Sequence, residues 1–192
     1  MSRTTRVPVD PRKRDSAHER YQRPQHECVN EASGWVRVKN LADVATSISS
    51  TLGAYKVDPQ HLLEHYRVYI GCTTNTNKGK GKGKAEYRIK GATFEQLEDA
   101  VDHLVMVFFI CPECGLPDST PVVRQLPTAG GKGKKEPTVC IGCHACSANE
   151  RVQPRSKADH KFYAKMLKVA PRDYSKSGKK QKGGKKGSRT GS

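Results

Sequence analysis

Hydrophobic side chains recur every three or four residues in three stretches of the chain, a pattern that predicts three amphipathic helices. Asn40 is a candidate N-cap for the first helix, and Asp58 followed by Pro59 marks the start of the second. Thr93 and Gln96 have the spacing of a capping box at the start of the third helix. The apolar positions are Leu41, Val44, Ala45 and Ile48 in the first helix, Leu62, Leu63, Tyr66 and Ile70 in the second, and Phe94, Leu97, Ala100, Val101, Leu104 and Val105 in the third.

Two shorter stretches have the pattern of β-strands. Trp35 to Val38 is rich in residues that favour strands, and Ala85 to Lys90 alternates between polar and apolar positions. Short strands mixed with helices in this way are typical of the α+β class. We therefore predict a small α+β domain over residues 20–107.

Two cysteine-rich segments follow the third predicted helix and are separated by a loop. They are Cys111-Pro-Glu-Cys114-Gly115 and Cys140-Ile-Gly-Cys143-His-Ala-Cys146. A two-residue spacer lets both thiolates of one turn reach a tetrahedral ion, so two such turns supply the four ligands of a zinc ribbon. We expect a four-Cys zinc ribbon over residues 108–152, with a structural zinc ion held by Cys111, Cys114, Cys143 and Cys146.

The third cysteine of the second segment leaves an alternative open. Thr138 to Ile141 has the pattern of a strand entering the turn, which places Cys140 on the strand and favours Cys143 with Cys146. The alternative pairs Cys140 with Cys143. A site closed by four thiolates has no open coordination position, so hydrolytic zinc chemistry is not expected. The sequence also lacks a phosphate-binding loop and a nucleophile elbow, and we expect no catalytic site of its own.

Positive charge is concentrated in three segments. The chain has 192 residues, with 35 Lys and Arg against 19 Asp and Glu, and a formal net charge of +16. Segments 78–84, 132–135 and 176–189 hold four, three and seven cationic residues without an acid, which accounts for 14 of these 16 charges. Such segments attract phosphate without reading sequence. We expect RNA contacts from Lys78, Lys80, Lys82, Lys84, Lys132, Lys134 and Lys135.

The remaining segments complete the expected organisation. Residues 1–19 and 172–192 lack hydrophobic periodicity, so we predict a disordered N-terminal tail and a disordered Lys-rich C-terminal tail. Residues 153–171 are expected to form a short helical extension. The longest apolar run, Leu104 to Cys111, has eight residues, fewer than the roughly 18 of a membrane-spanning helix. With no signal-peptide core at the N-terminus, we expect a cytoplasmic protein without a membrane partner.

Several short motifs occur in a fixed order along residues 20–170. They are Arg20-Tyr21-x-x-Pro24, Asn40-Leu-Ala-Asp-Val-Ala45, Pro59-Gln-His-Leu-Leu63, Ile89-Lys-Gly91, Leu97-Glu-Asp-Ala-Val-Asp102, Phe109-Ile-Cys-Pro-Glu-Cys114 with Pro117-Asp118, and Cys143-His-Ala-Cys146. Together they resemble the domain shared by eukaryotic translation initiation factor 5 and the beta subunit of initiation factor 2. The resemblance implies a translation initiation factor whose partners are GTP-bound initiation factor 2 with its gamma subunit, initiator tRNA and the rRNA of the small ribosomal subunit.

Within this family the motifs favour factor 5, which promotes GTP hydrolysis by initiation factor 2 at start-codon selection. The evidence is the run Asp43-Val44-Ala45 near the start of the first predicted helix, together with the segment Leu97 to Asp102 of the third. The alternative is the beta subunit of initiation factor 2, which binds initiator tRNA and is favoured by the motifs that begin at Pro59 and Pro117. A second alternative is a zinc-ribbon protein that binds nucleic acid outside this family.

The resemblance also implies a role for Arg20. In factor 5 the arginine of the Arg-Tyr-x-x-Pro element is thought to act as an arginine finger for the partner GTPase, and a guanidinium can neutralise charge on a transferring phosphoryl group. The alternative is that Arg20 is one of several solvated tail arginines, with Arg12, Arg14 and Arg23. Two lysines of the family have no counterpart at the aligned positions of this chain. The first aligns near Trp35 and the second aligns with Glu64.

Overall fold

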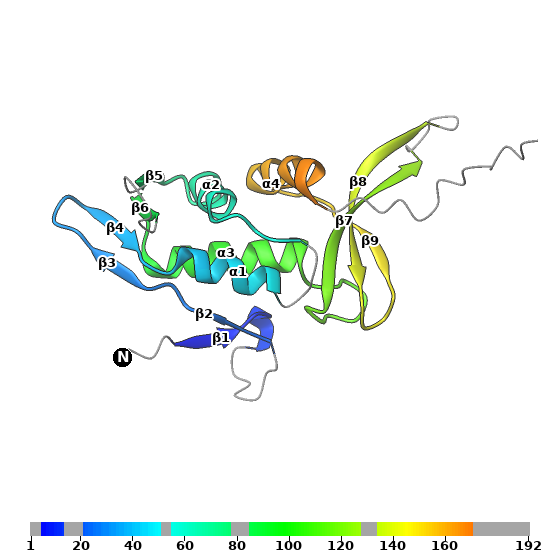
Figure 1. The fold of residues 1–192 in the computed structure, drawn as a ribbon, viewed down its shortest axis with the longest axis horizontal. Coiled ribbons are helices and arrows are strands. Elements are labelled where there is room, and N and C mark those ends of the chain that lie inside the picture. The colour runs from blue at the N-terminus through cyan, green and yellow to red at the C-terminus, as the bar shows by residue number, and fades with distance from the viewer. Residues whose placement is uncertain (1–4, 14–20, 51–54, 78–84, 128–133, 171–192) are drawn as a thin grey trace, which may run out of the picture.

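The computed structural model describes residues 5–13, 21–50, 55–77, 85–127 and 134–170. Figure 1 shows three parts in a row: a sheet at one end, helices in the middle and a second sheet at the other end. In chain order the elements are β1 (Arg6–Pro8), the 3-10 helix η1 (Pro11–Lys13), β2 (Gln22–Pro24), β3 (Cys28–Asn30), β4 (Trp35–Val38), α1 (Leu41–Ser50), α2 (Pro59–Tyr69), β5 (Thr73–Asn77), β6 (Glu86–Lys90), α3 (Phe94–Phe108), β7 (Ser119–Pro127), β8 (Lys135–Cys143), β9 (Asn149–Arg151) and α4 (Lys157–Val169).

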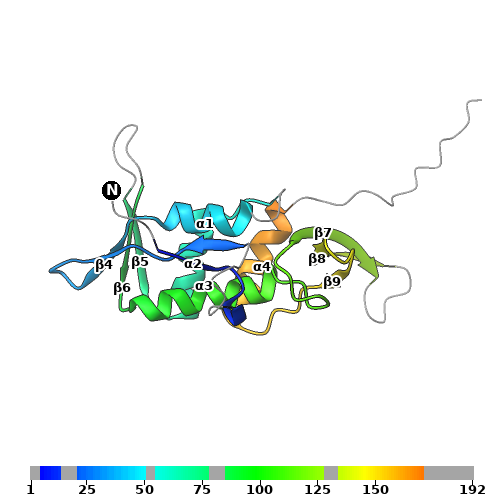
Figure 2. The same cartoon turned by 90° about the horizontal axis from the view of Figure 1, so that it is seen from below.

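The first sheet is antiparallel, with the strand order β3-β4-β6-β5. Helices α1, α2 and α3 lie on one side of it, as both cartoon views show (Figure 1, Figure 2). Their apolar stripes are buried together with Val38 and Ile89 of the sheet, which forms one continuous core. The prediction of an α+β fold is confirmed.

All three helices begin directly after the predicted N-cap residue, but Asn40 differs from Asp58 and Thr93 in what its side chain binds. The Asp58 carboxylate accepts a hydrogen bond from the Gln60 amide, and Thr93 and Gln96 form the capping box. Asn40 precedes α1, but its side chain links the chain before β3: its amide donates to the Gln25 carbonyl and its oxygen accepts from the Glu27 amide. The Asn40 side chain therefore fixes the segment that leads into β3.

The second sheet has the order β7-β8-β9 and forms the ribbon. Strands β7 and β8 pair along their whole length, from Ser119 with Cys143 to Pro127 with Lys135. The extension predicted for 153–171 contains α4, which packs against both the helical part and the ribbon. The Asp159 carboxylate lies 2.8 Å from His103 Nε2 of α3, and the Tyr163 hydroxyl accepts from the Val139 amide of β8 at 3.1 Å.

The prediction of a disordered tail over 1–19 is wrong for residues 6–13. Strand β1 pairs with β2 in an antiparallel ladder, and the Val9 amide donates to the Tyr21 carbonyl. Val9 is fully buried in the core. One buried valine and a three-residue ladder attach this segment to the rest of the fold. Neither involves enough residues to produce a periodic hydrophobic pattern in the sequence.

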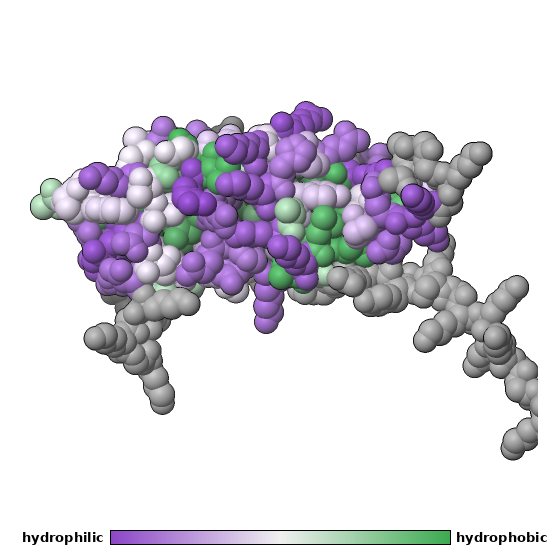
Figure 3. All heavy atoms as spheres, turned by 90° about the horizontal axis from the view of Figure 1, so that it is seen from above, coloured by the Kyte–Doolittle hydropathy of each residue, from purple (hydrophilic) through white to green (hydrophobic). Residues whose placement is uncertain are grey.

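The lysines of segment 78–84 and the predicted tail 172–192 lie outside the described residues. In the sequence, segment 78–84 lies between β5 and β6. Within the described ranges, no helix is long and apolar enough to cross a membrane. Figure 3 shows one face of the molecule, which is mostly hydrophilic, with hydrophobic atoms reaching the surface where the helices meet the ribbon.

Candidate metal centre

The first cysteine pair lies in a tight turn between α3 and β7. The Gly115 amide donates to the Cys111 carbonyl at 2.9 Å, and the Cys111 amide donates to the Leu116 carbonyl at 3.0 Å. Gly115 has a φ of +69°, a conformation that is inexpensive for glycine and strained for residues with a Cβ. The glycine of the Cys-x-x-Cys-Gly motif therefore closes the turn that brings Cys111 and Cys114 together.

The second pair lies in the turn between β8 and β9. The Cys143 amide donates to the Ala148 carbonyl at 2.9 Å, and the His144 amide donates to the Asp118 carbonyl at 2.8 Å, which ties this turn to the chain beside the first pair. Ser147 has a φ of +60°, so it reverses the chain at the position after Cys146. Backbone hydrogen bonds thus fix both turns against each other.

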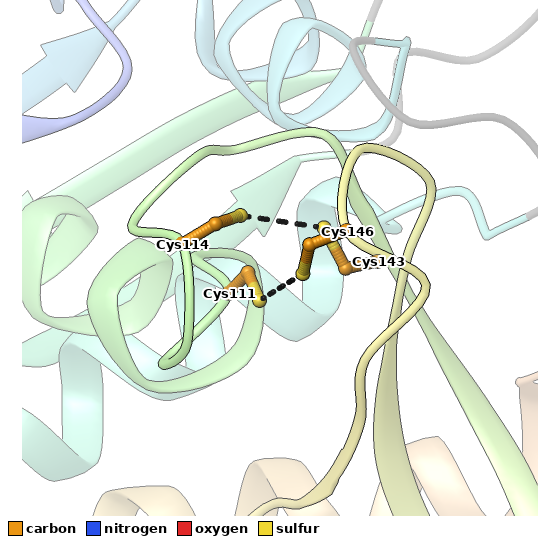
Figure 4. A group of neighbouring side chains, drawn as sticks. All are labelled: Cys111, Cys114, Cys143 and Cys146. Carbon is orange, nitrogen blue, oxygen red and sulfur yellow. Dashed lines mark hydrogen bonds between the residues drawn. The ribbon is translucent and has the colours of Figure 1, made fainter.

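The four thiols converge on one point (Figure 4). The sulfur atoms of Cys111 and Cys146 are 3.7 Å apart, those of Cys114 and Cys143 are 3.6 Å apart, and all four lie within 4.8 Å of one another. Four sulfurs about 2.3 Å from a tetrahedral zinc ion are separated by about 3.8 Å. The arrangement can hold a metal ion, and both the spacing and the all-sulfur donor set fit zinc.

Cys140 takes no part in this cluster. It lies on β8, is buried, and its thiol points back to the Thr138 carbonyl at 3.9 Å. Adjacent residues of a strand face opposite sides, so Cys140 and Cys143, three positions apart, cannot share one ligand sphere while both remain on β8. The structure brings together Cys111, Cys114, Cys143 and Cys146, the ligand set favoured by the sequence. The alternative set with Cys140 is not formed.

A family model for the domain found in the beta subunit of initiation factor 2 and in initiation factor 5 matches residues 11–149. The chain belongs to this family. The match runs from η1 to the start of β9 and so includes the α+β domain and all four cysteines, whereas α4 lies beyond it. No curated protein matches the chain. Membership in this family makes the chain a translation initiation factor domain.

The structure describes only two of the other predicted site residues. Arg20 lies outside the described residues, as do Lys78, Lys80, Lys82, Lys84 and Lys132. Lys134 and Lys135 are described and exposed at the start of β8, at the end of the ribbon away from the cysteines. The structure therefore brings the four cysteines together and leaves the RNA contacts a prediction.

Arg23 shows that the tail arginines are not alike. Its side chain is fully buried, and its Nη2 atom contacts Glu98 Oε2 at 2.9 Å and Asp102 Oδ1 at 2.7 Å on α3. The description of Arg23 as a solvated arginine is wrong. The sequence holds only part of this signal: Glu98 and Asp102 are four residues apart and adjoin the apolar stripe, where acids require a cation, but nothing near Arg23 in the sequence identifies it as that cation.

His26 completes this buried cluster. Its Nδ1 atom lies 2.5 Å from Glu98 Oε1, and its Nε2 atom lies 2.8 Å from the Tyr66 hydroxyl. Burial outweighs the nearby carboxylate and lowers the pKa of His26, so the neutral ring donates to Glu98 and accepts from Tyr66. Burial opposes ionisation of Glu98, but the hydrogen bond from His26 and the charge of Arg23 lower the pKa of Glu98 to about 2.

A second N-terminal arginine joins β1–η1 to the metal turn. Arg12 Nη2 is 2.9 Å from Asp10 Oδ2 and donates to the Gly115 carbonyl at 3.1 Å. The bond to Arg12 and its charge lower the pKa of Asp10 against the effect of burial. The chain on both sides of segment 14–20 is thus anchored, at Arg12 through the Gly115 carbonyl and at Tyr21 through the Val9 amide.

Proposed function

We propose that the chain acts with GTP-bound initiation factor 2 and initiator tRNA on the small ribosomal subunit, in the manner of factor 5. Family membership over residues 11–149 carries the proposal. The factor 5 assignment is supported by the run Asp43-Val44-Ala45, which lies in α1, and by the segment Leu97 to Asp102, which lies in α3. The proposed site of action is in the cytoplasm.

In this proposal Arg20 is the group supplied to the partner. It directly precedes Tyr21, a residue whose carbonyl accepts a hydrogen bond from the Val9 amide beside the β1–β2 ladder. An arginine delivered from a fixed base loses less entropy on docking than one on a free tail. Its guanidinium would neutralise charge on the γ-phosphoryl group of the partner's GTP, a contribution worth about 10³ to 10⁵ in rate for arginine fingers.

The ribbon would serve as a rigid support. We propose zinc as the metal held by Cys111, Cys114, Cys143 and Cys146, with a structural role, because four thiolates leave no position for substrate or water. The ion would supply folding energy to a module whose own apolar core is small. The lysines of the 78–84 and 132–135 segments would contact RNA phosphates.

Single-turnover GTP hydrolysis on assembled initiation complexes tests the proposal. The wild-type chain is expected to accelerate phosphate release, Arg20→Ala to remove most of the acceleration, and Arg14→Ala, a matched change in the same segment, to leave it intact. Equal acceleration by wild type and Arg20→Ala would reject the arginine finger. No acceleration by wild type would reject the factor 5 assignment.

The beta subunit of initiation factor 2 is the second candidate. It is favoured by Pro59-Gln-His-Leu-Leu63, which the structure places at the N-terminal half of α2, and by Pro117-Asp118 after the first cysteine turn. This assignment predicts stable copurification with the gamma subunit at high salt. A factor 5 type protein would dissociate under the same conditions, so the two candidates are separable.

A further inference from the structure

A groove of about 570 Å³ lies between the C-terminal end of α3 and the segment that leads from β9 to α4. It borders the first cysteine turn, whose Cys111 is one of its lining residues. Its floor comes from both parts of the molecule, the helical domain and the ribbon. The apolar lining residues are Met106, Val107, Ile110, Pro112, Ile141 and Val152.

The rim of this groove is cationic. Arg12, Arg151 and Arg155 line it, together with a single acid, Glu150. The charge of Arg12 is balanced by Asp10, whereas Arg151 donates to the neutral carbonyl of Pro127. Among the described residues, the Arg155 guanidinium has no ion-pair or hydrogen-bond partner. Arg151 and Arg155 are both exposed, so their charge is available to a ligand.

We propose that this groove, called here the α3–ribbon groove, binds a segment of a partner protein with large apolar side chains flanked by Asp or Glu. The apolar side chains would cover the floor, and the carboxylates would pair with Arg151 and Arg155, which can bind them in a bidentate manner. This inference does not depend on the function proposed above.

A peptide fits the groove better than RNA does. Proteins that bind unpaired bases stack successive bases on several aromatic rings, and the lining offers one ring, His103, which already contacts Asp159 and stacks on Tyr69. The floor is aliphatic and includes a methionine, a residue type suited to peptide side chains of varied shape. An RNA ligand could pair its phosphates with the arginines, but it would leave the aliphatic floor of the groove exposed to water.

None of the segments outside the described ranges has the composition expected of the occupant. The sequence outside the described ranges comprises 1–4, 14–20, 51–54, 78–84, 128–133 and 171–192. Segment 14–20 contains acids but no large apolar residue, and segments 78–84 and 128–133 contain neither. Segment 171–192 has one acid, Asp173, and is dominated by lysine, which the arginine rim would repel. None combines several large apolar side chains with acids, so none of these segments is complementary to the groove.

The test uses the full-length, metal-loaded chain as bait for a phage-displayed library of random dodecapeptides. Selected peptides are synthesised with a fluorescent label, and their affinity is measured by anisotropy. The groove variants are Arg155→Glu, which reverses an exposed charge, and Met106→Glu, which places a charge on the floor. Lys168→Glu and Val169→Glu are matched controls, because both residues are exposed on α4 and neither lines the groove.

We expect selected peptides to be enriched in Asp or Glu beside large apolar residues. Their affinity should fall at least tenfold for each groove variant and less than twofold for each control. The result for Met106→Glu counts only if the metal content and the helical circular dichroism of this variant match those of the wild type. If Met106→Glu misfolds, the Arg155→Glu variant still tests the proposal. Failure to enrich any peptide, or equal binding by Arg155→Glu, overturns the proposal.

Two further results would assign the groove to another ligand and so overturn the proposal. One is loss of affinity for a labelled single-stranded RNA in the groove variants, with no selected peptide affected. The other is self-association of the wild-type chain in sedimentation velocity that Arg155→Glu abolishes, which would identify the occupant as a second copy.

Discussion

Replacing Arg23 with methionine should strongly destabilise the α+β domain. The Arg23 side chain is fully buried and contacts two carboxylates, Glu98 at 2.9 Å and Asp102 at 2.7 Å. Methionine has a similar length but no charge, so both acids would stay buried beside each other without their cation. Removing one partner from a buried ion pair costs about 3 to 5 kcal/mol. We expect a loss of this size in the free energy of unfolding at pH 7.

The pH dependence of stability gives an independent magnitude. The pKa of Glu98 is about 2 in the folded chain and 4.5 in its usual environment. Because the folded value is the lower one, the stabilisation is complete above about pH 4.5 and is lost as the pH falls toward 2. Its size is about 3 kcal/mol at 1.36 kcal/mol per pKa unit. Without Arg23 the pKa of Glu98 rises, so the variant should lose less stability over this range.

Urea unfolding followed by circular dichroism at pH 7 and pH 3 measures both effects. The matched control is Arg67→Met, because the Arg67 side chain is 52% exposed and its ion pair with Glu64 lies on the surface. Surface changes of this kind alter stability by no more than about 0.5 kcal/mol. A loss below about 1 kcal/mol for Arg23→Met, or an unchanged pH dependence, would refute the assigned role of the cluster.

Three other changes probe the metal turns and α4. Titration with a chromophoric chelator should release one zinc per chain from wild type and Cys140→Ser, and less from Cys143→Ser, which loses a ligand; equal release from both variants would contradict the ligand set. Gly115→Ala should lower the unfolding free energy by about 1 kcal/mol, because φ is +69° and the added Cβ would meet Arg12 Nη2 at 3.3 Å; an unchanged denaturation midpoint would argue against the strain. Asp159→Asn should cost about 1 to 2 kcal/mol, since the carboxylate accepts from the Ser156 amide and contacts His103; amide hydrogen exchange would show faster opening of α4, and unchanged exchange would count against this role.

Elements with a long repeating pattern were predictable from the sequence. The helix from Phe94 to Phe108 has apolar residues at helical spacing along its length and a capping box, so both its buried face and its start were predictable. The cysteine ligands were predictable for a similar reason, because the Cys-x-x-Cys spacing encodes the geometry of a turn. Periodicity and fixed spacing are local signals, which need no knowledge of the tertiary structure.

Features that depend on one distant contact were not predictable in the same way. Strand β1 is attached by a three-residue ladder and the burial of Val9, and neither produces a pattern over several residues. Arg23 resembles its exposed neighbours in sequence, and its burial depends on acids 75 and 79 positions away. Asn40 occupies an N-cap position, but contacts with Gln25 and Glu27 determine its side chain. In each case a tertiary contact outweighs the local preference.

Sedimentation with initiation complexes tests the central claim most directly. Small ribosomal subunits are assembled with initiator tRNA and initiation factor 2 in its GTP-bound form, and the labelled chain is followed through a sucrose gradient at physiological salt. We expect the chain to migrate with the subunits, and the bound fraction to fall several-fold when initiation factor 2 and initiator tRNA are omitted. A chain that stays at the top of the gradient, or binds equally without them, would contradict the claim that it acts on the initiation complex.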